Sequence, residues 1–340
     1  MLRLPCGMQI VYTIKESDFR LSFYELIDKT SIGCPNPLLG LRLFSAAILI
    51  GSVLFVIGMD AWKPLLQTPG LWLVPVMAIF VGGTAWEFSQ LVNRQIAIRS
   101  SLATALSLLI IFLAAIPIFY QAITGRSYPE DCPIGGLGWI GIGSVAACGI
   151  AGIAMLYSYS LGESKSLEQW AVLTLISVYA GGLGAFWVSI RISGAPVVSL
   201  MILVGIIAVT KVTDAAAYFT GRSIGRTKLC PSISPGKTVE GAIGGLLSGM
   251  IVAWLYFHCF LPWFIPTMGP NVGWWGPVLV GLLLGLVGLI GDLLESVVKR
   301  SVGAKDSGSL LPGLGGIWDV TDSLLPTTVV GYLGIVAHWI

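Results

Sequence analysis

The chain has 340 residues, of which 55% are hydrophobic and 11% are charged, and its mean hydropathy is +0.87. A soluble domain carries about a quarter charged residues, so this composition excludes a soluble globular protein over most of the length. The net charge of +2 gives no support for nucleic-acid binding. The six Cys residues show no C-x-x-C spacing and predict neither a metal nor a redox site.

Apolar runs of about 20 residues predict membrane-spanning helices. The sequence therefore predicts an all-α, polytopic integral membrane protein with about nine transmembrane helices. We divide it into a lead-in (1–42), N-terminal transmembrane helices (43–195) and a C-terminal catalytic transmembrane domain (196–340). The nine runs are 43–59, 71–92, 101–120, 134–158, 167–190, 196–219, 239–261, 275–295 and 324–340.

The distribution of Lys and Arg predicts the orientation of these helices. With the N-terminus in the cytoplasm, fifteen Lys and Arg residues fall on cytoplasmic segments and three (Lys63, Arg126 and Arg191) on the opposite side. This asymmetry predicts a cytoplasmic N-terminus and a non-cytoplasmic C-terminus. For a bacterial source, the membrane would be the inner or plasma membrane.

Glu87 is a carboxylate within the second apolar run. Carboxylates at membrane depth are commonly functional or paired with another group. Two interpretations stay open: a pocket or substrate residue, and an interfacial residue bonded to a neighbouring helix.

The first polar block of the C-terminal half is "KVTDAAAYFTGRSIGRTKLCPSISPGKTVEG", residues 211–241. Its Gly-Lys-Thr at a helix start indicates phosphate binding, because helix N-termini attract anions. It is not a Walker-A loop, since Pro231 stands where that motif needs Gly. An ordinary basic loop explains the block equally well.

Two further blocks, 291–308 and 312–326, concentrate carboxylates. Asp292 and Glu295 share one helix face, and Asp319 and Asp322 have the same spacing. Carboxylates of this kind suit Mg²⁺, which is held by one or two of them together with substrate phosphates. Acids at a helix N-terminus would explain one Asp but not the whole group. Together the three blocks predict a nucleotide–metal site that faces the cytoplasm and opens onto lipid.

The run "SVVKRSVGAKDSGSLLPGLGGIWDVTDS", residues 296–323, resembles the signature of phosphatidate cytidylyltransferases (CDP-diacylglycerol synthases). The stretch "DAAAYFTGRSIGRTKLCPSISPGKTVEGAIGG" and the hexapeptide "GDLLES" are also similar to conserved segments of that family. The resemblance covers residues 205–330. Two positions depart from it: Leu314 stands where the family has His, and Val320 where it has Arg.

The resemblance implies that CTP and phosphatidate react to give CDP-diacylglycerol and pyrophosphate, with Mg²⁺ and a second cation as cofactors. It assigns Asp292, Asp319 and Asp322 to the metal and to catalysis, together with Lys305. Asp214 is either a site carboxylate or the partner of Lys211. The remaining substrate-binding residues would be Arg222, Ser234, Lys237, Thr238, Lys299, Arg300, Gly315 and Gly316.

The implied partners are the two substrates and membrane lipid, with no nucleic acid. A homodimer is also compatible with the family and with the glycine-rich run that begins at Gly241, although such glycines equally serve packing within one chain. The alternatives are a CTP-dependent lipid kinase, a cytidylyltransferase for another lipid phosphate, a transporter, and an inactive paralogue suggested by Leu314 and Val320.

Overall fold

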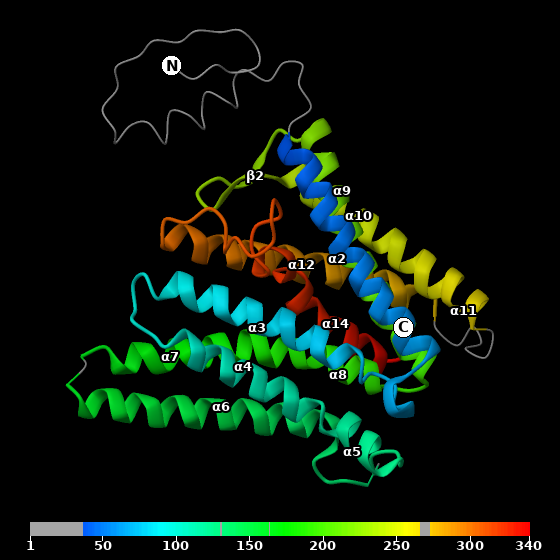
Figure 1. Cartoon of the computed structure of the whole chain (residues 1–340). Helices are drawn as coiled ribbons and strands as arrows, with labels where there is room; N and C mark the ends of the chain where they lie inside the picture. The colour runs from blue at the N-terminus through cyan, green and yellow to red at the C-terminus, as the bar shows by residue number, and fades with distance from the viewer. Residues whose placement is uncertain (1–36, 130, 163, 266–272) are drawn as a thin grey trace, which may run out of the picture.

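The computed structural model describes residues 37–129, 131–162, 164–265 and 273–340, so most of the predicted lead-in lies outside the described residues. The described chain is a bundle of helices with one pair of short antiparallel strands (Figure 1). The helices are α2 (Pro37–Trp62), α3 (Leu73–Val92), α4 (Ser100–Ala114), α5 (Ile116–Thr124), α6 (Gly135–Ser160), α7 (Ser166–Ile176), α8 (Leu183–Ile192), α9 (Pro196–Ile224), α10 (Val239–Ala253), α11 (Leu261–Phe264), α12 (Trp275–Ser301), α13 (Trp318–Thr321) and α14 (Leu324–Val336). Short helical turns η1 (Leu65–Gln67), η2 (Ser177–Gly182) and η3 (Trp254–Phe260) accompany them, and the strands are β1 (Lys228–Cys230) and β2 (Ser234–Thr238).

All nine predicted apolar runs are mostly helical, but nine membrane crossings are not confirmed. Within the described ranges, six helical segments are long and apolar enough to cross a membrane, and the pair α4–α5, bent by 51°, would make a seventh. Helix α3 is not among the six; it has 20 residues and contains Glu87 and Gln90. Helix α14 is too short, with 13 residues. The strand pair β1–β2 is a small departure from the predicted all-α fold.

Helices α9, α10 and α12 pack closely because glycines face the neighbouring helices. Gly249 of α10 lies against Thr213 of α9 and Gly281 of α12, so a Cβ at Gly249 or Gly281 would collide with the facing helix. The sequence left open whether the glycine-rich face packs within one chain or between two. These contacts are made within one chain.

The C-terminal segment brings the two halves of the chain together. The predicted boundary at residue 195 falls between α8 and α9, yet α14 packs against α8, α9 and α12. The hydroxyl of Thr328 in α14 donates a hydrogen bond to the carbonyl of Leu183 in α8 at 2.8 Å. The C-terminal segment is therefore supported by helices from both halves.

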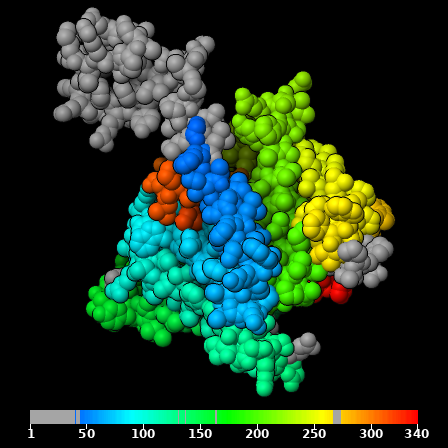
Figure 2. All heavy atoms as spheres, turned by 45° about the vertical axis from the view of Figure 1, so that its right-hand side comes forward, coloured from blue at the N-terminus to red at the C-terminus, as the bar shows by residue number. Residues whose placement is uncertain are grey.

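Helix α2 lies on the outside of the bundle (Figure 2), and only 6% of the residues in its apolar stretch are buried. Its last turn is fixed by a buried ion pair, in which Arg191 Nη2 lies 2.6 Å from Asp60 Oδ2. Asp60 also accepts a hydrogen bond from the N–H of Gly70, and Arg191 donates one to the Ser199 hydroxyl. This network joins α2 to the turn between α8 and α9, so one end of an otherwise peripheral helix is anchored.

Candidate functional site

A cavity of about 520 Å³ lies between α9, the strand pair, α10 and α12. Six residues that the sequence analysis assigned to the site line it: Asp214, Arg222, Ser234, Lys237, Thr238 and Asp292. Residues from two separate polar blocks of the sequence, 211–241 and 291–308, therefore meet in one place. The cavity has a cationic wall from Arg222, Lys228 and Lys237 and an acidic edge at Asp292.

The strand pair fixes the position of Lys237. Strands β1 and β2 are antiparallel, with Lys228 opposite Thr238. Thr238 ends β2 and caps α10, because its hydroxyl accepts a hydrogen bond from the N–H of Gly241 at 3.1 Å. The Glu240 carboxylate accepts hydrogen bonds from the N–H groups of Arg226 and Thr227. The Gly-Lys-Thr segment is thus a strand that runs directly into a capped helix.

Lys237 joins the cavity to helix α12. Its Nζ lies 2.8 Å from Asp292 Oδ2. The Nζ atom is buried, and besides this ion pair it has no hydrogen bond to another described residue, so an ammonium group with three donors has capacity left for a ligand in the cavity. A buried ammonium group at a cavity wall favours an anionic ligand.

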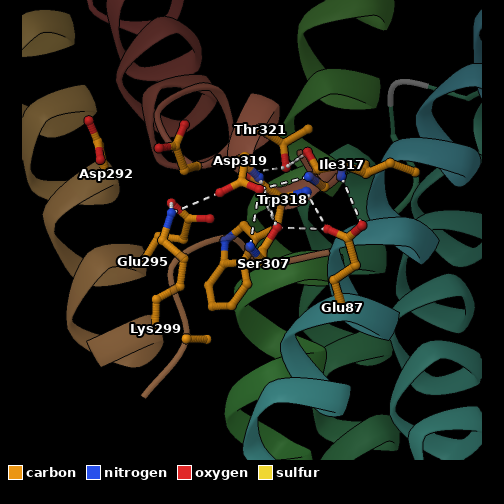
Figure 3. A network of polar contacts seen from close by, with 12 residues as sticks. Glu87, Asp292, Glu295, Lys299, Ser307, Ile317, Trp318, Asp319 and Thr321 are labelled. Atoms are coloured by element: carbon orange, nitrogen blue, oxygen red, sulfur yellow. Dashed lines mark hydrogen bonds and ion pairs between the residues drawn. The ribbon is translucent and has the colours of Figure 1, made fainter. Parts of the chain in front are cut away.

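Helix α12 presents Asp292, Glu295 and Lys299 toward the C-terminal segment (Figure 3). Lys299 Nζ lies 2.7 Å from Glu295 Oε2 and 2.8 Å from Asp319 Oδ1. Gly291 lies so close to the backbone of Asp322 that a Cβ there would collide with it. This glycine lets the two acidic segments approach each other.

Asp292, Glu295 and Asp322 form a carboxylate cluster in which one oxygen from each lies within 4.8 Å of the others. Glu295 is 1% exposed and its Oε1 has no hydrogen-bond partner among the described residues. Buried carboxylate oxygens are normally paired or bound to a metal. The donor set is three carboxylates, the type that Mg²⁺ prefers.

The charges around this cluster leave an excess of negative charge. The ion pairs and the carboxylate cluster together hold five carboxylates (Asp214, Asp292, Glu295, Asp319 and Asp322) and three ammonium groups (Lys211, Lys237 and Lys299). When all eight groups are ionised, two negative charges are unbalanced, which is the charge of one divalent cation. Burial and the nearby Asp292 raise the pKa of Asp322, which lies outside the candidate spans, to about 7.

Asp319 lies outside the cluster of three carboxylates, and its role as a metal ligand remains a prediction. Besides the ion pair with Lys299, it accepts hydrogen bonds at Oδ2 from the Ser307 N–H, the Ser307 hydroxyl and the Gly316 N–H. Burial acts to raise the pKa of Asp319, but the hydrogen bonds from Lys299 and Gly316 outweigh it and hold the pKa below its ordinary value. The structure therefore places Glu295, rather than Asp319, beside Asp292 and Asp322. Asp319 ties the loop 303–317 to α12.

Arg300, in the last turn of α12, and Lys305, which follows the helix, are not in the cavity lining. Arg300 donates hydrogen bonds to the carbonyls of Ile233 and Ala304, which joins α12 to the β1–β2 turn. Lys305 is exposed. Arg222, which does line the cavity, donates to the hydroxyl of Tyr218 at 3.2 Å.

The glycines at 315 and 316 have local reasons to lack a side chain. Gly315 has a φ of +97°, and a Cβ there would meet the Asp319 carboxylate. A Cβ at Gly316 would collide with Glu87 and Ser307. A contact between either glycine and a substrate phosphate remains a prediction.

Lys211 and Glu87 are parts of the site that the sequence analysis had left open. Lys211 Nζ lies 3.6 Å from Asp214 and donates hydrogen bonds to the Val320 carbonyl and the Ser323 hydroxyl. Asp214 is thus both the partner of Lys211 and part of the cavity lining. Glu87 is 3% exposed and contacts the loop before α13; its place inside an apolar run was the only sequence signal for it.

Comparison with known proteins gives a family match over most of the chain. Residues 41–337 match the model of the family described as the cytidylyltransferase family. The phosphatidate cytidylyltransferase of Haemophilus influenzae is 30% identical over 297 residues, which cover 83% of this chain and 93% of the relative. That of Brucella suis is 39% identical over 188 residues, or 54% of this chain, and the match spans only 62% of the relative's length. An uncharacterized Escherichia coli protein, YnbB, is 40% identical over 130 residues, covering 38% of this chain and 41% of the relative.

Proposed function

The chain belongs to the cytidylyltransferase family, and from this premise we propose that it converts CTP and phosphatidate to CDP-diacylglycerol and pyrophosphate. The observation that carries the proposal is the cavity whose cationic wall meets the carboxylate cluster, through the ion pair of Lys237 with Asp292. Two relatives named for this activity align with the chain, one of them over most of its length.

The cavity is suited to the triphosphate of a nucleotide. Its volume of about 520 Å³ is in the range of small-molecule sites. Arg222 and Lys237 would bind phosphate oxygens, and Ser234 and Thr238 would add hydrogen bonds, since all four line the cavity. The start of α10 lies at the same place, and its N–H groups favour negative charge.

Mg²⁺ fits the carboxylate cluster, and we assign its binding to Asp292, Glu295 and Asp322. The unpartnered Oε1 of Glu295 and the grouping of Glu295 with Asp292 and Asp322 support this choice over the predicted set that included Asp319, whose oxygens contact Lys299 and the Gly316 N–H. When bound, the cation would supply electrostatic stabilisation of charge on the phosphate oxygens. The second cation of the sequence analysis remains a prediction.

In the proposed reaction a phosphate oxygen of phosphatidate attacks the α-phosphorus of CTP. The bond from that phosphorus to the oxygen bridging to the β-phosphate breaks, and the electron pair leaves with pyrophosphate. Lys237 and Arg222 would reduce the repulsion between the two anions and hold them in line. The reaction requires no covalent enzyme intermediate, so the role of the protein is positioning and charge stabilisation.

We further propose that the site faces the cytoplasm. The loop after α3, which carries Arg94 and Arg99, lies at the same end of the bundle as the end of α12, because Gln95 donates a hydrogen bond to the Ser301 carbonyl at 2.5 Å. Cationic residues gathered at one end are typical of the cytoplasmic side. The acyl chains of the substrate would stay in membrane lipid. The homodimer remains a prediction for which light scattering of the detergent complex is the direct measurement.

The experiment is a transfer assay with CTP labelled at the α- or the γ-phosphate, using the full chain in phosphatidate-containing micelles. We expect α-label in the lipid and γ-label in pyrophosphate, with Mg²⁺ required. Transfer of γ-label to a lipid would instead identify a kinase, and absence of label from the lipid in both cases would refute the proposal. Lys165→Met, at an exposed lysine distant in sequence from the site, is a control for loss of one positive charge.

A further inference from the structure

One face of α3, in the N-terminal half, contacts α13 and the residues before it. The Thr84 hydroxyl is hydrogen-bonded to that of Thr321 at 2.7 Å. The ring of Phe88 stacks on Trp318 with centroids 4.2 Å apart. Glu87 lies between these two contacts and reaches the loop (Figure 3). Positions 84, 87 and 88 fall on one side of a helix, so this face makes a continuous contact with the acidic segment.

Glu87 is held entirely by donors from that segment. Its Oε1 accepts a hydrogen bond from the Ile317 N–H at 3.0 Å, and its Oε2 accepts one from the Trp318 N–H at 2.9 Å. Oε2 also lies 2.9 Å from the Ser307 hydroxyl, whose single proton Glu87 shares with Asp319 Oδ2. Among the described residues, no cation is paired with Glu87. Its charge is therefore stabilised by N–H and O–H groups of the loop, and the N–H groups of Ile317 and Trp318 would lose their acceptor without it.

These contacts connect Glu87 to the carboxylates of the site. The Ser307 hydroxyl lies 2.9 Å from Glu87 Oε2 and also 2.9 Å from Asp319 Oδ2. Asp319 pairs with Lys299, and Lys299 with Glu295 of the cluster. The N–H groups that Glu87 holds begin α13, which leads directly into Asp322, the cluster member from the C-terminal segment.

The tight fit around Glu87 excludes alternative arrangements of the loop. A Cβ at Gly308 or at Gly316 would collide with the Glu87 carboxylate. Ile317 packs equally closely against Gly83, one turn before Glu87 on α3. The loop is thus placed by contacts on two sides, with the carboxylate as its polar centre.

From this arrangement we infer that Glu87 is a positioning residue for the divalent-cation site, acting from the N-terminal half through α13 and the Glu87–Ser307–Asp319 contacts. It touches neither the cavity nor the carboxylate cluster. It sets the separation between Asp322 and the two carboxylates of α12. The inference rests on the proposed function for its cation, although it concerns cation binding and not the transfer reaction.

The test measures the binding of Mn²⁺ to the purified full chain by electron paramagnetic resonance, in the absence of substrates. Glu87→Gln places an amide NH₂ where a carboxylate oxygen accepts hydrogen bonds, so we expect about 10-fold weaker Mn²⁺ binding, the lower end of the effect of residues that orient metal ligands. Glu87→Asp keeps both acceptor oxygens and should restore part of the affinity. Glu168→Gln is the matched control, since Glu168 is an exposed acid on α7.

Hydrogen exchange of the backbone amides of residues 305–318 provides a second readout. Faster exchange of this segment in Glu87→Gln, with unchanged exchange in α6, is expected. Should Glu87→Gln not yield folded protein, Ser307→Ala removes the bridging hydroxyl alone and should also weaken Mn²⁺ binding.

Two results would overturn the inference: wild-type Mn²⁺ affinity in folded Glu87→Gln, or the absence of Mn²⁺ binding by the wild-type protein. Failure of the proposed function has a different outcome, because the wild type would then bind Mn²⁺ in a Glu87-dependent way without forming a CDP-lipid.

Discussion

Replacing Asp322 by Asn should stabilise the cation-free protein at pH 8 and at the same time remove cation binding and activity. The two effects have opposite signs because the same three carboxylates that would hold a cation repel one another without it. Asp322 is 7% exposed, so water screens this repulsion only weakly. Asn keeps the oxygen that accepts the hydrogen bond from the Ser323 N–H.

The size of the gain follows from the geometry. Carboxylate oxygens of Asp292, Glu295 and Asp322 lie within 4.8 Å of one another, and two unit charges at that distance repel by about 3.5 kcal/mol at an effective dielectric constant of about 20. The rise in the pKa of Asp322 from 3.8 to about 7 corresponds to about 4 kcal/mol. Lys211 offsets part of the repulsion, so we expect a net gain of about 2 to 4 kcal/mol.

The gain should depend on pH. In the wild type the raised pKa means that the folded state binds a proton more tightly than the unfolded state. Stability therefore falls as the pH rises from about 4 to about 7. Near pH 5 Asp322 is already protonated in the folded protein, so its replacement by Asn adds little to the stability. At pH 8 it is ionised, and Asn removes the repulsion.

The assay is thermal unfolding in detergent with a metal chelator at pH 5 and pH 8, followed by tryptophan fluorescence, with a second series in Mg²⁺. Asp131→Asn, at an exposed aspartate, is the control. We expect a higher midpoint for Asp322→Asn at pH 8 alone, and a Mg²⁺-dependent rise for the wild type alone. A lower midpoint at pH 8, or the same difference at both pH values, would refute the reasoning.

Two other substitutions separate binding from stability. Lys237→Met should raise the KM for CTP by about 10- to 100-fold, because it removes charge-assisted hydrogen bonds worth about 1.5–3 kcal/mol. Steady-state kinetics at saturating Mg²⁺ would measure this KM. An unchanged KM would show that Lys237 does not bind the triphosphate. Asp60→Asn should lower the free energy of unfolding by about 3 to 5 kcal/mol, because it leaves the charge of Arg191 buried and unpaired. The KM for CTP should stay the same in the folded fraction, since neither Asp60 nor Arg191 lines the cavity. Denaturant unfolding would measure the free energy of unfolding, and steady-state kinetics would measure the KM. An unchanged free energy of unfolding or an altered KM would contradict the prediction.

Much of the fold class could be predicted from the sequence because the lipid environment imposes a simple rule on the chain. Long apolar runs must be helical to satisfy their backbone hydrogen bonds, and the predicted runs are mostly helical in the structure. The number of crossings could not be read in the same way. Helix α3 carries Glu87 and Gln90 and α14 has 13 residues, so the lengths and polarities of individual helices depend on what packs around them.

The residues of the cavity could also be predicted, since Asp214, Arg222, Ser234, Lys237, Thr238 and Asp292 lie in motifs whose chemistry is visible along the chain. Helical spacing showed that Asp319 and Asp322 are close to each other, but not which of them joins Asp292 and Glu295 in the carboxylate cluster. Gly291 admits the backbone of Asp322, whereas the Asp319 side chain is turned toward Lys299 and the loop 303–317.

The sequence by itself determined a helical membrane protein with a Gly-Lys-Thr segment at a helix start, clustered carboxylates and a family resemblance that the comparisons confirm. Those features are local, because composition, spacing and motif are properties of neighbouring residues. Only the tertiary structure decided that Glu295 joins Asp292 and Asp322, and that Glu87, more than 200 residues before the loop it holds, supports them. Such contacts depend on how α3, α12 and α13 pack, and packing brings together residues whose positions in the sequence give no sign that they meet.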